Sequence, residues 1–137
     1  MADAVDTQVM VNGQNRYVAR FTNLSDGTGE STVTKVDRSA LTGPDGVNAP
    51  AKLVIEELDW NVQGFTYVSL LWDDGTDQQI DLLSGDSYRD YRHLGGLVPD
   101  DHTDQVATPA NGDIILTTAG LTSGNTYDIT VVLRLKV

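Results

Sequence analysis

Residues Phe21–Gly43 read FTNLSDGTGESTVTKVDRSALTG and indicate the kind of structure that the chain adopts. They hold the end of a strand (Phe21–Asn23), a loop of turn-forming residues (Ser25–Glu30), a second strand (Ser31–Asp37) and a polar exit. Glycine reaches positive φ without steric cost, and Ser and Asp side chains accept hydrogen bonds from nearby backbone amides. The stretch therefore predicts antiparallel strands joined by tight polar loops.

The last eleven residues carry the clearest period of two in the chain. Apolar residues alternate there with Asp128, Thr130, Arg134 and Lys136 as far as the final valine. Such alternation is typical of a strand with one buried face. We therefore expect the C-terminus to be held in a sheet.

Similar patterns predict further strands. The expected strands are Thr7–Val11, Arg16–Asn23, Ser31–Asp37, Lys52–Val62, Phe65–Trp72, Gln78–Leu83, Asp113–Thr118 and Tyr127–Val137. In the strand expected at Gln78–Leu83, the side chains of Ile80 and Leu82 are expected to point toward the core. Residues Gly85–Gly96 fit either a strand or an irregular crossing, and Leu97–Gly112 reads as a long loop.

Two of these assignments leave alternatives open. In Lys52–Val62 the apolar parity is broken at Glu56, so a helix is possible for the first half, although the alternation up to Gly64 favours a strand. For the first two strands, a turn at Asn12-Gly13 would set Val9 opposite Arg16. A four-residue loop would instead pair Val9 with Val18, and we favour it because it matches apolar residues.

These elements predict an all-β protein, an antiparallel β-sandwich that is jelly-roll-like, with about eight strands. Residues 1–5 are expected to be a flexible N-terminal arm and residues 6–137 a single domain. The chain has 137 residues and no cysteine, so its stability cannot depend on disulfides.

Composition narrows the possible partners. The net charge is −11, and between Lys52 and Arg134 only two basic residues face fourteen acidic ones. Such a chain repels nucleic acids and anionic membranes, so neither is an expected partner. No apolar run approaches the ~20 residues of a membrane span, and the N-terminus lacks the pattern of a secretory signal. We expect the protein to fold in the cytoplasm.

No catalytic, cofactor or metal site is predicted. Asp73–Asp77 resembles a calcium loop, but the sixth and twelfth positions of an EF-hand would be Gln78 and Ser84, so the pattern fails, and only a weak calcium site of another kind stays open. His93 and His102 are too few for a zinc site. The chain has no nucleophile elbow and no phosphate-binding glycine motif. We expect no enzymatic activity.

The segment Tyr88-Arg89-Asp90-Tyr91-Arg92-His93 is the only basic and aromatic cluster in an acidic region. Tyr and Arg are enriched at protein interfaces, so Tyr88, Arg89, Tyr91 and Arg92 are the predicted interface residues. The alternative is local ion pairing with Asp86 and Asp90.

Three aromatic residues also admit two interpretations. Trp60, Tyr67 and Trp72 could form a sugar-binding platform, because aromatic faces stack on sugar rings. They lie among apolar neighbours on expected strands, which favours packing in the core.

Four blocks of the sequence resemble small structural proteins of tailed bacteriophages. These blocks are FTNLSDGTGESTVTKVDRSAL (Phe21–Leu41), WNVQGFTYVSLLWD (Trp60–Asp73), LGGL (Leu94–Leu97), and GDIILTTAG (Gly112–Gly120) with the closing strand Thr126–Lys136. The segments Asp45–Ala51 and Val98–Gln105 do not match well and are candidates for partner specificity.

The resemblance implies a capsid decoration, or cement, protein on the virion surface. Its partners would be the major capsid protein and copies of itself, with a trimer as the expected oligomer, assembled in the host cytoplasm. A neck, tail or fibre-base component is the alternative within the same set of proteins. A carbohydrate-binding β-sandwich is a further alternative.

Overall fold

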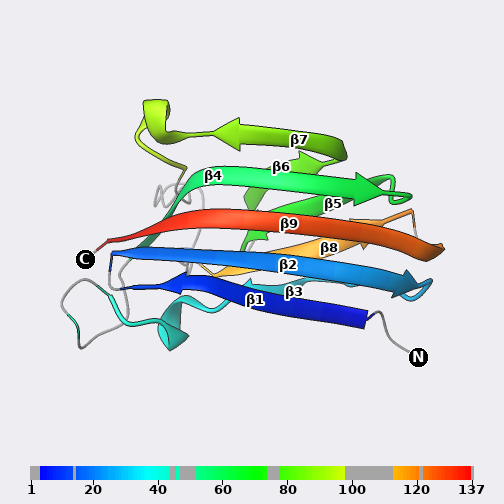
Figure 1. Ribbon diagram of the computed structural model, residues 1–137, viewed down its shortest axis with the longest axis horizontal. Coiled ribbons are helices and arrows are strands. Elements are labelled where there is room, and N and C mark those ends of the chain that lie inside the picture. The colour runs from blue at the N-terminus through cyan, green and yellow to red at the C-terminus, as the bar shows by residue number, and fades with distance from the viewer. Residues whose placement is uncertain are drawn as a thin grey trace.

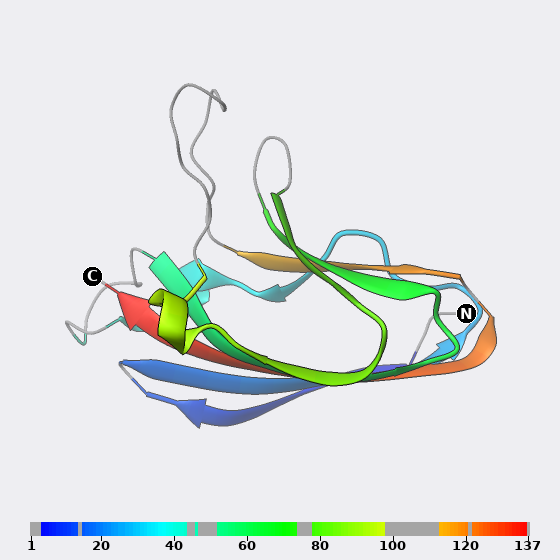
Figure 2. The ribbon, with the colours of Figure 1, turned by 90° about the horizontal axis from the view of Figure 1, so that it is seen from above.

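The computed structural model describes residues 4–13, 15–43, 46, 52–73, 78–97, 113–120 and 122–136. They form two antiparallel sheets that face each other (Figure 2). The larger sheet has the order β1 (Ala4–Asn12), β2 (Arg16–Asp26), β9 (Ser123–Lys136), β4 (Lys52–Gln63) and β7 (Gly85–Asp90). The smaller sheet has the order β3 (Val33–Val36), β8 (Ile114–Ala119), β5 (Tyr67–Trp72) and β6 (Gln78–Leu83). Two short 3-10 helices, η1 (Arg38–Ala40) and η2 (Arg92–Leu94), lie between strands.

The chain alternates between the two sheets from β2 to β9, except at the β5–β6 hairpin (Figure 1). The resulting orders β2-β9-β4-β7 and β3-β8-β5-β6 are those of a jelly roll, with β1 added beside β2. This confirms the predicted antiparallel sandwich. The described residues form nine strands, and the addition to the eight expected is β7, from the segment that the sequence left ambiguous.

The loop after β2 has the predicted turn chemistry, but it joins strands of two different sheets. Ser25 Oγ accepts a hydrogen bond from the backbone N–H of Gly27, and Asp26 Oδ1 accepts one from Thr28, each at 3.0 Å. Gly27 and Gly29 both have positive φ. The loop does not form a hairpin, because β2 and β3 belong to different sheets and β3 pairs with β8.

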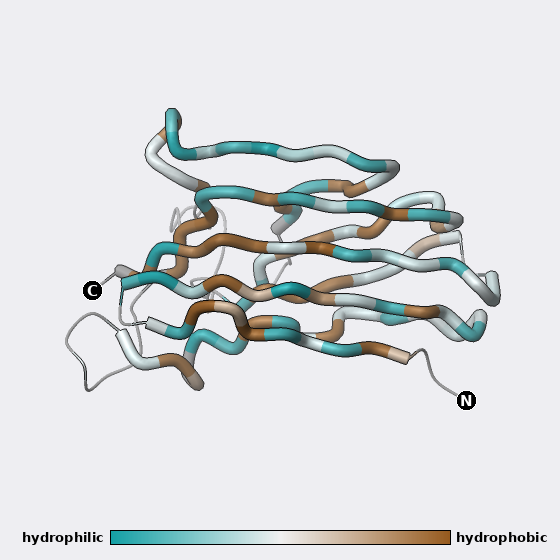
Figure 3. The backbone as a smooth tube through the Cα atoms, in the orientation of Figure 1, coloured by the Kyte–Doolittle hydropathy of each residue, from teal (hydrophilic) through white to brown (hydrophobic). Residues whose placement is uncertain are grey.

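The core lies between the sheets and comes from alternate residues of the strands. Figure 3 shows hydrophobic stretches along β4 and β9, whereas β7 at the edge is hydrophilic. In β4 a bulge at Glu56 explains the broken parity, because Leu53 and Ile55 face the core before it and Leu58 and Trp60 after it. The whole segment is a strand, as favoured from the sequence.

A second bulge corrects the prediction for β6. Asp81 lies opposite Leu70 and Gln79 lies opposite the next residue of β5, which leaves Ile80 as the extra residue. Ile80 packs against the core as expected. Leu82, however, is exposed and Leu83 is fully buried, because the bulge reverses the side that each following residue faces.

The β1–β2 hairpin has neither of the two predicted registers. Val9 lies opposite Ala19 and Val11 lies opposite Val18, with a bulge at Met10 between them. Both predictions assumed unbroken pairing, which a bulge does not allow.

Strand β1 also begins earlier than expected. Ala4 and Val5, expected in the flexible arm, instead pair with Leu24 and Asn23 of β2. The remainder of that arm, residues 1–3, lies outside the described residues.

Candidate protein interface

The four predicted interface residues lie on β7 and at the start of η2. In the described residues β7 pairs only with β4, so its other edge is free (Figure 1). Tyr88 lies opposite Asp59 and Arg89 lies opposite Leu58, whose side chain is in the core. Residues opposite each other point to the same side of a sheet, so Tyr88 and Arg89 leave β7 on different sides.

Tyr88 and Arg92 belong to a group on the outer face of the larger sheet. The Arg92 guanidinium lies 2.9 Å from carboxylate oxygens of both Glu57 and Asp90. Hydrogen bonds from the Arg92 side chain and backbone hold the pKa of Asp90 at about 2. Hydrogen bonding and charge from Asp90 in turn raise the pKa of Arg92. The Tyr88 side chain stands beside this group and is exposed.

Arg89 and Tyr91 belong to a second group at the seam between the two sheets. Asp81 of β6 accepts a hydrogen bond from the Tyr91 hydroxyl at 3.1 Å, and its Oδ2 lies 3.1 Å from Arg89 Nε. The Arg89 guanidinium is also 6.0 Å from the ring centroid of Trp60. Burial, and then the Asp81 charge, raise the pKa of Tyr91 to about 12.

The structure therefore divides the predicted set into two pairs with different surroundings. Of the local ion pairs expected as the alternative, the pair with Asp90 is observed, whereas the described ion pairs of Arg89 and Arg92 do not include Asp86. The pairing with Glu57 and Asp81 was missed, because these acids come from other strands and no sequence spacing marks them. Tyr88, Arg89 and Arg92 are each more than half exposed, whereas Tyr91 is partly buried and packs against the core. Their role at an interface stays a prediction.

The crossing that follows η2 is fixed by the LGGL segment. The backbones of Leu97 and Ile55 exchange two hydrogen bonds of 2.9 Å, which join this segment to β4 just before the bulge at Glu56. Gly96 has a φ of 93°, and a Cβ there would lie 2.1 Å from Val54 Cγ1. The segment thus covers Val54, which is fully buried.

The sugar-binding platform that the sequence left open does not form, and the favoured packing in the core is found for Trp60 and Trp72 but not for Tyr67. Trp60 and Trp72 are buried in the core, and the Trp60 indole donates a hydrogen bond to the Ser84 carbonyl at 3.1 Å. Tyr67 alone is exposed, on the outer face of the smaller sheet. It borders a shallow depression of about 470 Å³.

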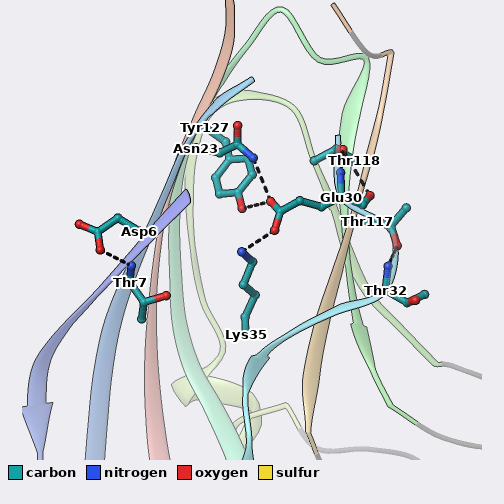
Figure 4. A network of polar contacts seen from close by, with 9 residues as sticks. All are labelled: Asp6, Thr7, Asn23, Glu30, Thr32, Lys35, Thr117, Thr118 and Tyr127. Carbon is teal, nitrogen blue, oxygen red and sulfur yellow. Dashed lines mark hydrogen bonds and ion pairs between the residues drawn. The ribbon is translucent and has the colours of Figure 1, made fainter. Parts of the chain in front are cut away.

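A buried polar network ties the two sheets together (Figure 4). Glu30, from the loop after β2, lies 2.6 Å from the Lys35 ammonium of β3. Its other oxygen accepts hydrogen bonds from Asn23 of β2, at 2.9 Å, and from the hydroxyl of Tyr127 of β9. The sequence showed only a glutamate and a lysine in a polar stretch, and nothing there marked them as partners. Both charges are buried and paired, so we interpret the network as structural.

Several other predicted features lie partly or wholly outside the described residues. No cluster of three or more His, Cys, Asp or Glu suited to a metal ion occurs within the described ranges. Asp74–Asp77, His102, and most of Asp45–Ala51 and Leu97–Gly112 lie outside them. None of the helices in the part of the chain that the structure covers is long and apolar enough to cross a membrane.

Comparison with known proteins adds no relative. No protein-family model matches the chain, and no curated protein matches it.

Proposed function

We propose that this protein is a capsid decoration protein of a tailed bacteriophage. It binds the outer surface of the major capsid shell without covalent chemistry and works as a small oligomer, for which the resemblance implies a trimer. Each contact across a joint between capsid subunits adds binding energy, and linked copies gain avidity.

The observation that carries this proposal is the edge of β7 that pairs with none of the described strands. Tyr88, Arg89 and Arg92 expose more than half of their side chains there, on an otherwise acidic protein. Tyr and Arg are the residues that most often dominate the binding energy of protein interfaces. Ion pairs with Asp81, Glu57 and Asp90 hold the two arginines in place before a partner arrives, which lowers the entropy lost on binding. The resemblance of the sequence to phage structural proteins implies the partner, the major capsid protein.

Binding to capsids tests the assignment of this edge. Particles stripped of the protein are mixed with wild type, with Tyr88→Ala, or with the double variant Arg89→Gln and Arg92→Gln, then pelleted and quantified. Removing one dominant interface side chain costs about 2 kcal/mol or more, so binding should weaken roughly 30-fold. The matched control is Arg20→Gln, another exposed, ion-paired arginine of the larger sheet that lies on β2. Unchanged binding by both variants, with intact folds, would refute the β7 assignment.

Copy number in purified particles tests the function itself. A decoration protein is present in numbers comparable to the major capsid protein and lies on the shell. A few copies located at the neck, tail or fibre base would instead support the alternative virion role. Absence from the particle would overturn the proposal.

A further inference from the structure

Strand β1 is an edge strand whose residues are all exposed. It has nine residues and pairs only with β2 among the described strands (Figure 1). The other edge strands are shorter, with six residues in β7, four in β3 and six in β6. A long free edge presents unpaired backbone N–H and C=O groups that another strand can bind.

Several exposed apolar side chains flank this edge. Five of the ten large hydrophobic residues that are exposed in the described ranges belong to β1 and β2, with 43–55% of their surface accessible; they are Val5, Val9, Met10, Val11 and Leu24. Val9 lies opposite core-facing Ala19, whereas Val11 lies opposite Val18 on the outer face, so both sides of the strand carry valines. Apolar groups gathered beside a free backbone edge are typical of an interaction surface.

The same region is electrically neutral. Residues 4–26 contain two acids, Asp6 and Asp26, and two bases, Arg16 and Arg20. The net charge of −11 is therefore carried entirely by the rest of the chain. Two copies of an acidic protein repel each other least when they meet through a neutral surface, which favours a second copy as the occupant of this edge.

We propose that β1 pairs antiparallel with β1 of a second copy about a two-fold axis at Gln8. Gln8 is the midpoint of Ala4–Asn12, and this register pairs Asp6–Met10 of the two copies without interruption. Beyond them the bulge at Met10 changes the faces to which Val11 and Asn12 point, so the regular pairing ends there. It sets Thr7 opposite Val9 of the other copy, and both side chains point to the core side of the sheet because they lie opposite Phe21 and Ala19 of β2. The larger sheets then join into one continuous sheet with five strands from each copy.

Charge and twist are compatible with this register. The only charge in β1 is Asp6, which faces Met10 of the second copy. The two Asp6 residues lie about 14 Å apart, four residues at about 3.4 Å each, which exceeds the ~8 Å Debye length of physiological salt. The Met10 bulges of the two copies lie near opposite ends of the pair and add twist there. The central residues Thr7–Val9 therefore form the most regular contact.

Solution mass gives the first test. The proposal predicts that sedimentation or light scattering, over rising concentration, shows the mass changing from 14.8 kDa to twice that value. A monomer at all concentrations overturns it, and so does the trimer that the resemblance implies, because β1 pairing about a two-fold axis joins only two copies. The result does not depend on the capsid role, because it is measured on the isolated protein.

A cysteine at the axis gives a positive test of the register. The chain has no cysteine, so Gln8→Cys introduces a single thiol. Opposed residues in an antiparallel pair have Cα atoms about 4.5–5.5 Å apart, which suits a disulfide. We expect Gln8→Cys to oxidise to a covalent dimer at least tenfold faster than the control Gln63→Cys, on the internal strand β4. Equal rates overturn the register.

A charge at the axis gives the complementary test. Gln8 lies opposite Arg20 of its own chain, so Gln8→Glu gains a favourable neighbour within the monomer. In the dimer it sets two negative charges against each other, and the dissociation constant should rise at least tenfold. Gln63→Glu is the matched control and should leave it unchanged. A dimer insensitive to Gln8→Glu overturns the proposal.

Discussion

Glu30→Gln should destabilise the protein far more than the same change at an exposed ion pair. Lys35 and Glu30 lie 2.6 Å apart with side chains only 5% and 6% exposed. Arg20 and Asp128 lie 2.7 Å apart, but their side chains are 43% and 42% exposed. The two pairs thus have nearly the same shortest N···O distance and differ in burial, and the exposed pair has a second hydrogen bond, from Arg20 Nε to Asp128 Oδ1.

The expected magnitudes follow from that difference. Glu30→Gln keeps the shape of the side chain but leaves the Lys35 ammonium buried without a counter-charge, which costs about 3–5 kcal/mol. Asp128→Asn removes the acid from a pair in solvent, which costs about 0–1 kcal/mol. The free energy of unfolding is measured by urea titration, with fluorescence of the buried Trp60 and Trp72 as the signal.

A double variant separates the charge from the packing. Adding Lys35→Met to Glu30→Gln removes the unpaired charge, so the double variant should be at least ~1 kcal/mol more stable than Glu30→Gln alone. If Glu30→Gln costs no more than Asp128→Asn, burial does not govern the strength of these pairs and the reasoning is refuted.

Two further predictions concern the β7 end of the sandwich. Gly96→Ala should cost at least ~1 kcal/mol more than Gly95→Ala in urea unfolding, because both glycines have positive φ but only at Gly96 would the added Cβ meet Val54; equal costs would contradict this packing. The pKa of Tyr91 is raised from 10.0 to about 12 in the folded protein. The contribution of the protonated Tyr91 side chain to the free energy of unfolding is therefore present below pH 10 and is lost as the pH rises toward 12. Tyr91→Phe should flatten the fall in stability over that range; an unchanged profile would show that burial and the Asp81 contact do not raise the pKa of Tyr91.

Several features could be read from local sequence because their causes are local. Alternation along Tyr127–Leu135 identifies a strand with one buried face wherever its neighbours lie. The turn chemistry at Ser25–Gly29 depends on side chains reaching amides two residues away, and it was found as predicted. An all-β sandwich follows from these signals together, since strands with one apolar face must cover it with another sheet.

The candidate interface was predictable only as a composition. The cluster of Tyr and Arg at residues 88–92 is visible in the chain, but its division between an outer-face group and a seam group depends on Glu57 and Asp81. Both acids lie on strands whose positions beside β7 are set by the topology of the sheets.

Three-dimensional packing alone fixed the registers, the bulges and the buried network. The bulges at Met10, Glu56 and Ile80 each change the side of the sheet to which the following residues point, and each depends on the pairing with its particular partner strand. Glu30 accepts a hydrogen bond from Tyr127, 97 positions away, after the chain has crossed between the sheets several times. The local sequence pattern indicates the strands and the turns, because their causes lie within a few residues. Which distant residue becomes the neighbour of a side chain depends on the packing of the whole core.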